Sequence, residues 1–136
     1  MRDVAAYLGI FVVYVSLNLA WLSLVALDLY RRELGVLLVE KPRAGVAFAF
    51  YMLHSFGVLI LAVQPALAAG TWHKAAVSGA LFGLCTYAAY DLTNAATLRR
   101  WPGGLVLLDL ACGTILTSLG SVAGFFVARW TSAGPS

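Results

Sequence analysis

The chain has 136 residues, of which 62% are hydrophobic and 11% are charged; its net charge is +3 and its mean hydropathy +0.88. A soluble globular domain carries about a quarter charged residues, so this composition excludes a water-soluble protein and indicates a single all-α membrane domain. The basic residues fall in short segments between apolar runs, where they mark membrane topology, and this excludes a nucleic-acid-binding face.

Four apolar stretches are each close to the roughly 20 residues that a spanning helix needs. In chain order they cover residues 4–29, 44–63, 75–98 and 105–128. Within lipid the backbone must bond to itself, so runs this long and apolar are expected to form helices. The sequence therefore predicts a four-transmembrane-helix bundle that forms one domain over residues 1–136, and a disordered tail at 131–136.

The connections between the spans predict the orientation of the chain. A charged loop follows the first span (31–43), a short turn region from Gln64-Pro65 to Lys74 follows the second, and a basic hairpin (99–104) follows the third. Six of the nine Lys and Arg residues lie in the first and last of these connections. Positive charge is retained in the cytoplasm, so we expect a multi-pass protein of the cell inner membrane with both termini on the non-cytoplasmic side. Tyr30 and Trp101 are expected to mark the inner interface.

Small residues predict a tight contact between the last two spans. Gly79 and Gly83 on the third span, and Gly120 and Gly124 on the fourth, are both small-xxx-small pairs. A hairpin folded about Trp101 would place Gly79 level with Gly124 and Gly83 level with Gly120. A homodimer seam or a chance spacing of glycines is the alternative.

Polar residues share faces with these glycines at helical spacing. The third span carries Tyr87, Asp91 and Asn94 on its glycine face, and the hairpin would bring the last two to the depth of Asp109 on the fourth span. The first and second spans add further polar or aromatic side chains, which are Tyr14, Asn18, Trp21, Asp28, Tyr51 and His54. Three aspartates from three spans are therefore expected in the cytoplasmic half of the bundle.

Two interpretations of this constellation stay open. Polar groups can simply hold helices together, each bond contributing about 0.6 kcal/mol on average. An ionisable residue inside the membrane is also a functional hypothesis in its own right. On that view the carboxylates of a cytoplasm-facing pocket hold a cation or proton, Arg31, Arg99 and Arg100 rim it and hold an anionic head group, and His54 forms its floor. The candidate ligand-binding residues are Asn18, Trp21, Asp28, Arg31, His54, Tyr87, Asp91, Asn94, Arg99, Arg100 and Asp109.

Three functional hypotheses follow from these residues. The first is binding or transport of a small polar or ionic ligand or a lipid head group, with a homo-oligomer expected if the protein is a transporter. The second is a membrane-embedded enzyme that modifies lipid, and the third is an accessory subunit of a larger membrane complex. In the enzyme hypothesis the carboxylates would act as base or metal ligands and the arginines would hold a head-group phosphate. The chain lacks the HExxH, GxSxG and phosphate-loop motifs, so no catalytic residue, metal site or cofactor is assigned.

The stretch Tyr90-Asp91-Leu92-Thr93-Asn94-Ala95-Ala96-Thr97-Leu98-Arg99, followed by Trp101-Pro102, resembles a family of small bacterial membrane proteins catalogued only as a domain of unknown function. The resemblance covers nearly the whole chain and includes Trp21-Leu22, Pro65-Ala66-Leu67 and Asp109-Leu110-Ala111. The chain departs from the family pattern at Asn18, where the pattern has an acidic residue, and at Cys112, where it tends to have tryptophan. The resemblance implies a four-span membrane protein and no established catalytic role.

Overall fold

The computed structural model describes residues 1–133, and its regular elements are all helical. Consecutive helical segments join into four long helices, which we call rods. The first rod joins α1 (Arg2–Trp21), the π-helical turn η1 (Leu22–Ala26), α2 (Leu27–Leu34) and the 3-10 turn η2 (Gly35–Leu37). The second rod joins α3 (Ala44–Val58), the π-helical turn η3 (Leu59–Val63) and α4 (Gln64–Ala69). The last two rods are α5 (Trp72–Thr97) and α6 (Gly103–Ser132). The expected all-α fold is confirmed.

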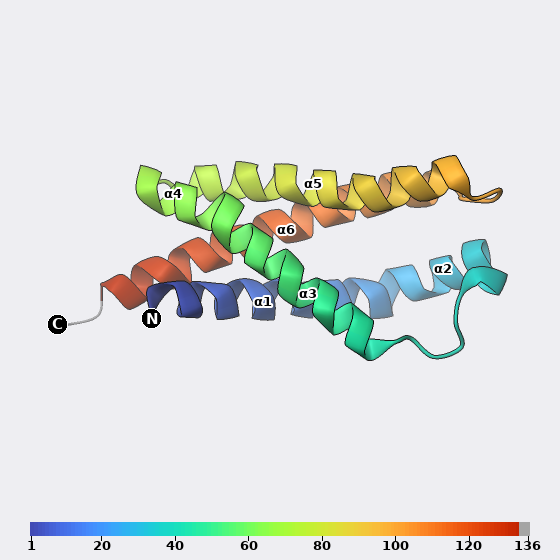
Figure 1. Ribbon diagram of the computed structural model, residues 1–136, viewed down its shortest axis with the longest axis horizontal. Helices are drawn as coiled ribbons and strands as arrows, with labels where there is room; N and C mark the ends of the chain where they lie inside the picture. The colour runs from blue at the N-terminus through green and yellow to red at the C-terminus, as the bar shows by residue number, and fades with distance from the viewer. Residues whose placement is uncertain (134–136) are drawn as a thin grey trace.

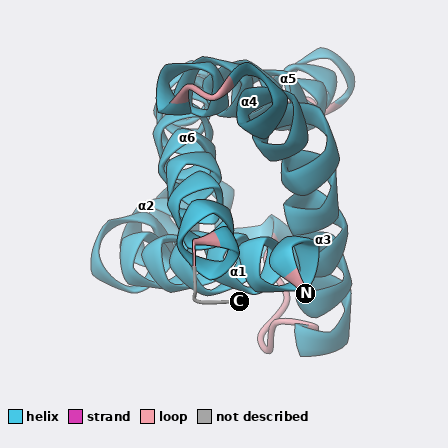
Figure 2. Ribbon diagram, turned by 90° about the vertical axis from the view of Figure 1, so that its left-hand side faces the viewer, coloured by secondary structure: helices cyan, strands magenta, loops and turns pink. Residues whose placement is uncertain are grey.

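The four rods are alternately antiparallel, so the start of α1 and the end of α6 lie at the same end of the bundle (Figure 1). Viewed end-on, α1, α3, α5 and α6 surround the bundle axis, with α3 and α6 on opposite sides (Figure 2). Helix α6 packs closely against both α5 and α1. The second rod packs against α5 mainly through η3 and α4, and α3 diverges from α5 beyond them. This divergence opens the aromatic pocket of the site described below.

Three rods are long and apolar enough to cross a membrane, namely Arg2–Leu37, Ala44–Ala69 and Gly103–Ser132. Helix α5 is less apolar, but its 26 residues reach about 39 Å at 1.5 Å per residue, more than the roughly 30 Å hydrocarbon core. The expected first loop begins later than predicted, because Arg31 and Arg32 still belong to α2. Thr131 and Ser132, which were expected in a disordered tail, belong to α6; residues 134–136 lie outside the described part of the chain.

The predicted turn region from Gln64-Pro65 to Lys74 begins later than expected, because the second rod continues through the proline to Ala69. Proline lacks an N–H and its ring crowds the carbonyl four residues earlier, so it normally breaks a helix. Here Pro65 lies in the first turn of α4, directly after the wide π-helical turn η3. The wider turn gives the ring room, and the chain reverses instead at Gly70, whose φ of 70° suits glycine.

Helices α5 and α6 pack in a regular register of four-residue steps. A Cβ built on Gly79 would meet Ser121, one on Gly83 would meet Thr117 and the Gly113 carbonyl, and one on Gly113 would meet the Tyr87 ring. The next step along both helices pairs Asp91 with Asp109. Contact along i, i+4 rows of both helices is the commonest way in which helices interlock. The predicted tight hairpin is therefore present.

The partners of the fourth-span glycines differ from the prediction. A Cβ on Gly120 would lie 3.3 Å from Tyr14, and one on Gly124 would meet Ile10, so both glycines face α1. Positions 113, 117 and 121 form the row that faces α5, while 120 and 124 lie on the adjacent row of the same helix. Helix α6 thus uses two neighbouring faces of small residues, and this allows it to contact two helices closely at once.

The two halves of the bundle differ in polarity. Around the end that holds α4, the core is a cluster of buried apolar side chains, including Ile10, Val63 and Phe125. The half toward α2 and the α5–α6 hairpin contains the buried carboxyl groups instead. The buried core therefore has an apolar end and a polar end, and the candidate site described next lies in the polar half and at its border.

Candidate functional site

A hydrogen-bonded network of polar side chains crosses the middle of the bundle. The Tyr14 and Tyr87 hydroxyls lie 2.6 Å apart, Asn18 donates to Tyr87 at 3.0 Å, and Tyr51 donates to the Asn18 carbonyl at 2.8 Å. Three rods thereby share one network. Tyr14, one of its members, is fully buried. The members of the network satisfy one another, as polar groups inside a membrane protein must.

His54 lies beside this network rather than at the floor of an open pocket. Its Nε2 is 3.0 Å from the Thr117 hydroxyl, and its ring stacks on Tyr14 with the centroids 4.5 Å apart. Phe50 and Phe82 close its other sides. Its side chain is buried, and Nδ1 has no hydrogen-bond partner among residues 1–133. These contacts fit a histidine that is hydrogen-bonded inside the bundle and helps to hold its helices together.

Two carboxyl groups meet in the polar half. Asp91 from α5 is fully buried, and Asp109 from α6 is 4% exposed. The register of α5 against α6 brings the two groups opposite each other. Asp109 accepts a hydrogen bond from the Tyr30 hydroxyl. Both oxygens of Asp91 lack a hydrogen-bond partner in the described part of the chain, and burying a polar group without one is costly.

No basic side chain balances this carboxyl pair within residues 1–133. The single ion pair in that range joins Arg2 and Asp3, at the far end of the bundle. Arg31, Arg99 and Arg100 are exposed and form no ion pair there with Asp91 or Asp109. Two like charges held together in a low-dielectric interior repel strongly, so the pair needs a positive charge or a proton from elsewhere.

A pocket of about 430 Å³ opens beside the network, where α3 and α5 diverge. It is lined by Phe50 from α3 and by Thr86, Tyr87 and Tyr90 from α5. Tyr87 belongs to both the pocket wall and the network. Tyr90 directly precedes Asp91 and packs edge-on against Trp101, with the ring centroids 5.8 Å apart. The pocket therefore has an aromatic wall close to the carboxyl pair along α5, although neither Asp91 nor Asp109 lines it.

Several predicted site residues lie elsewhere. Asp28 is exposed on α2, so the expected meeting of three aspartates is reduced to two. Asp28 is two residues from Tyr30, and helical geometry turns the tyrosine, rather than the carboxylate, toward α6. Trp21 lines an apolar groove with Cys112 between α1 and α6. Asn94 is half-buried one turn beyond Asp91.

The arginines gather at the surface of the polar end. Arg99 and Arg100 line a groove of about 490 Å³ together with Arg32 and Glu33, while Arg31 is not among its lining residues. The groove lies where the α5–α6 hairpin approaches the end of α2 and η2. Arg32, which the sequence prediction omitted, replaces Arg31 there because the helix continues through both residues.

Tyr30 and Trp101 lie closer to the carboxyl pair than the sequence predicted. Both were expected at the inner interface, yet the Tyr30 hydroxyl reaches Asp109, and the Nε1 atom of Trp101 is buried. A signal was available for Tyr14 and Tyr51, which share helical faces with Asn18 and His54. No comparable signal was available for Tyr30, since the change in helical phase at η1 alters which side chains face inward.

Replacing Tyr51 with phenylalanine tests whether the network stabilises the bundle. The change removes the donor to Asn18 and leaves a part-buried carbonyl without its partner, so we expect a loss of about 0.5–1.5 kcal/mol in the free energy of unfolding. The loss is measured by denaturant unfolding of the purified protein in detergent. Tyr7→Phe, which removes an exposed bond to the Met52 carbonyl, is the matched control and is expected to change stability less.

A family model described as "Predicted membrane protein (DUF2177)", a domain of unknown function, matches residues 3–126. No curated protein matches the chain, and no solved structure does.

Proposed function

The chain belongs to this family of membrane proteins, and on that premise we propose that it binds a small organic cation in the polar half of its bundle. The observation that carries the proposal is the buried Asp91–Asp109 pair, which has no basic partner within residues 1–133. Buried charges in membrane proteins are normally paired. A bound cation would supply the missing positive charge.

The neighbouring pocket favours an organic cation over a metal ion. Three of its four lining side chains are aromatic, and aromatic faces attract ammonium and related cations, at about 0.5–2 kcal/mol each. Among the described residues, no group of three or more His, Cys, Asp or Glu side chains could hold a metal ion. The volume of about 430 Å³ lies within the range of roughly 300–1,000 Å³ found for small-molecule sites.

The pocket and the carboxyl pair act together in this proposal. The aromatic rings would contact the apolar groups of the ligand, while the carboxyl pair attracts its charge from one helical turn beyond Tyr87. Water screens charges poorly in such an interior, so an attraction over several ångströms still matters. The separation of α3 from α5 gives the ligand a way in from the side of the bundle.

The test is binding of methyltriphenylphosphonium to the purified protein in detergent, compared with its neutral counterpart triphenylphosphine oxide. We expect the cation to bind more than about tenfold more tightly than the neutral compound. The attraction between two opposite unit charges ~10 Å apart, at an effective dielectric constant of ~20, contributes roughly 1.7 kcal/mol. Equal affinity for the two compounds would contradict a cation site. Calorimetry or equilibrium dialysis measures both.

Phe50→Leu tests the aromatic wall separately from the charge. Leucine keeps an apolar side chain but removes the ring, so we expect cation affinity to fall about three- to fivefold, which corresponds to ~0.5–1 kcal/mol. Phe56→Leu is the matched control, because Phe56 lies on the same helix, is 55% exposed and does not line the pocket. An equal loss in both variants would show that the ring of Phe50 makes no specific contact with the cation.

We also infer that the bundle spans the membrane four times with both termini on the non-cytoplasmic side. The inference rests on the distribution of Lys and Arg and on the antiparallel course of α5 along α6. Alkaline phosphatase fused to the C-terminus is expected to be active and a fluorescent protein fused there to be dark. The opposite pattern would reverse the orientation or reduce the number of spans.

A further inference from the structure

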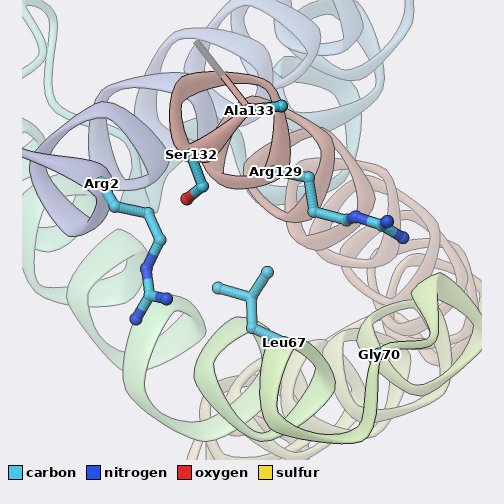
Figure 3. Close-up of a pocket in the computed structure, with 6 residues that line it drawn as sticks. All are labelled: Arg2, Leu67, Gly70, Arg129, Ser132 and Ala133. Carbon is cyan, nitrogen blue, oxygen red and sulfur yellow. The ribbon is translucent and has the colours of Figure 1, made fainter. Parts of the chain in front are cut away.

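A second pocket of about 430 Å³ lies at the opposite end of the bundle from the carboxyl pair. It is formed where the start of α1, the end of α4 and the end of α6 come together (Figure 3). Its lining residues are Arg2, Leu67, Gly70, Arg129, Ser132 and Ala133.

Two arginines from different helices make this pocket positively charged. In Figure 3 the guanidinium groups of Arg2 and Arg129 lie on either side of the opening, with the Leu67 side chain between them. Arg129 forms no ion pair within residues 1–133, and its guanidinium lies over the Phe125 ring, 5.8 Å from the centroid. Arg2 bonds Asp3 through Nε alone, at 3.3 Å. Both arginines therefore retain donors for an anion.

The surroundings place this pocket at the level of the membrane surface. Trp130 follows Arg129 and is 80% exposed, and Trp72 at the start of α5 is 43% exposed. Exposed tryptophans at the ends of apolar helices are typical of the membrane–water interface. Lipid phosphates lie at this depth, and arginine is well suited to phosphate because its planar fork can donate two parallel bonds.

We propose that Arg2 and Arg129 bind a phosphate group at this end of the bundle. Leu67 offers an apolar contact next to the two charges, and this combination matches a phosphate that carries an apolar ester. The same two arginines could take the phosphate from an anionic phospholipid or from solution. This site is separate from the proposed cation site, since its residues belong to the opposite end of the bundle.

Native mass spectrometry of the full chain, with phosphatidylglycerol added to the detergent, tests the proposal. The wild type is expected to retain the lipid, and Arg2→Gln and Arg129→Gln are each expected to weaken retention about fivefold, as the loss of one basic group near an anionic surface implies. Lys74→Gln is the matched control, because Lys74 is a basic residue at the start of α5 that does not line the pocket. It is expected to retain the lipid.

Two further measurements make every outcome decisive. Competition by inorganic phosphate would identify a soluble anion as the ligand, whereas retention of lipid against phosphate would identify the phospholipid; either result supports a phosphate site. Equal retention by the wild type and by the Arg2→Gln/Arg129→Gln double variant would overturn it. Methyltriphenylphosphonium binding of the double variant is expected to be unchanged, which shows that the variant is folded and separates this site from the proposed cation site.

Discussion

Replacing Asp91 with asparagine is expected to abolish most cation binding while leaving the protein as stable as the wild type or more so. Asp91 is fully buried beside Asp109, and both of its oxygens lack partners among residues 1–133. Removing one of two facing carboxylates relieves their repulsion and the cost of burying a charge. We expect a gain of up to about 1 kcal/mol in stability and a loss of affinity of more than about tenfold for methyltriphenylphosphonium.

Thermal unfolding and cation binding of the same detergent-purified samples check this prediction. Asp28→Asn is the matched control, since it makes the same chemical change at an exposed carboxylate of the first rod. The control is expected to shift stability by less than about 0.5 kcal/mol. A marked loss of stability in Asp91→Asn would instead show that the carboxyl pair holds α5 and α6 together, and the structural interpretation would then replace the cation site.

Gly83→Ala is expected to destabilise the α5–α6 hairpin. A Cβ at this position would collide with the Gly113 carbonyl oxygen and with the Thr117 side chain, 2.7 Å away. The backbone oxygen cannot move aside without shifting the whole of α6. Overpacking of this kind costs about 1–3 kcal/mol, and that cost exceeds the gain of up to about 1 kcal/mol that alanine brings to a helix.

The unfolding midpoint of Gly83→Ala in detergent measures the loss. Gly45→Ala controls for helix propensity, because a Cβ on Gly45 in the first turn of α3 would meet nothing within 4 Å. The control is expected to be neutral or slightly stabilising. If Gly83→Ala melts at the wild-type temperature, the close approach of the two helices at Gly83 does not determine stability.

The pairing of Asp91 with Asp109 was predictable from the sequence. Two long apolar stretches joined by the short segment 98–102 must form an antiparallel pair, and residues equally distant from the turn must then meet. The apolar composition likewise determined a helical membrane protein, because lipid allows the backbone few other structures. Helix existence, the order of the rods and the meeting of these two carboxyl groups were therefore predictable.

Orientation about each helix axis was not predictable, and it decided the rest of the site. Exposed and buried faces of a membrane helix are both apolar, so the sequence holds little record of which face turns inward. Asp28 and Tyr30 illustrate this, since both are polar and close together, yet only Tyr30 reaches the carboxyl pair. The glycine partners of α6 were mispredicted for the same reason.

The sequence by itself thus determined the class of protein, the four helical rods and the depth, along the bundle axis, at which its carboxyl groups lie. The tertiary structure decided which side chains meet at that depth. It turned Tyr30 rather than Asp28 inward, placed Phe50 opposite Tyr87 and Tyr90 across a pocket, and left the arginines at the surface. The physical reason is that depth follows from counting residues along a helix, whereas lateral contact depends on helix rotation and divergence, which close packing of all four rods sets together.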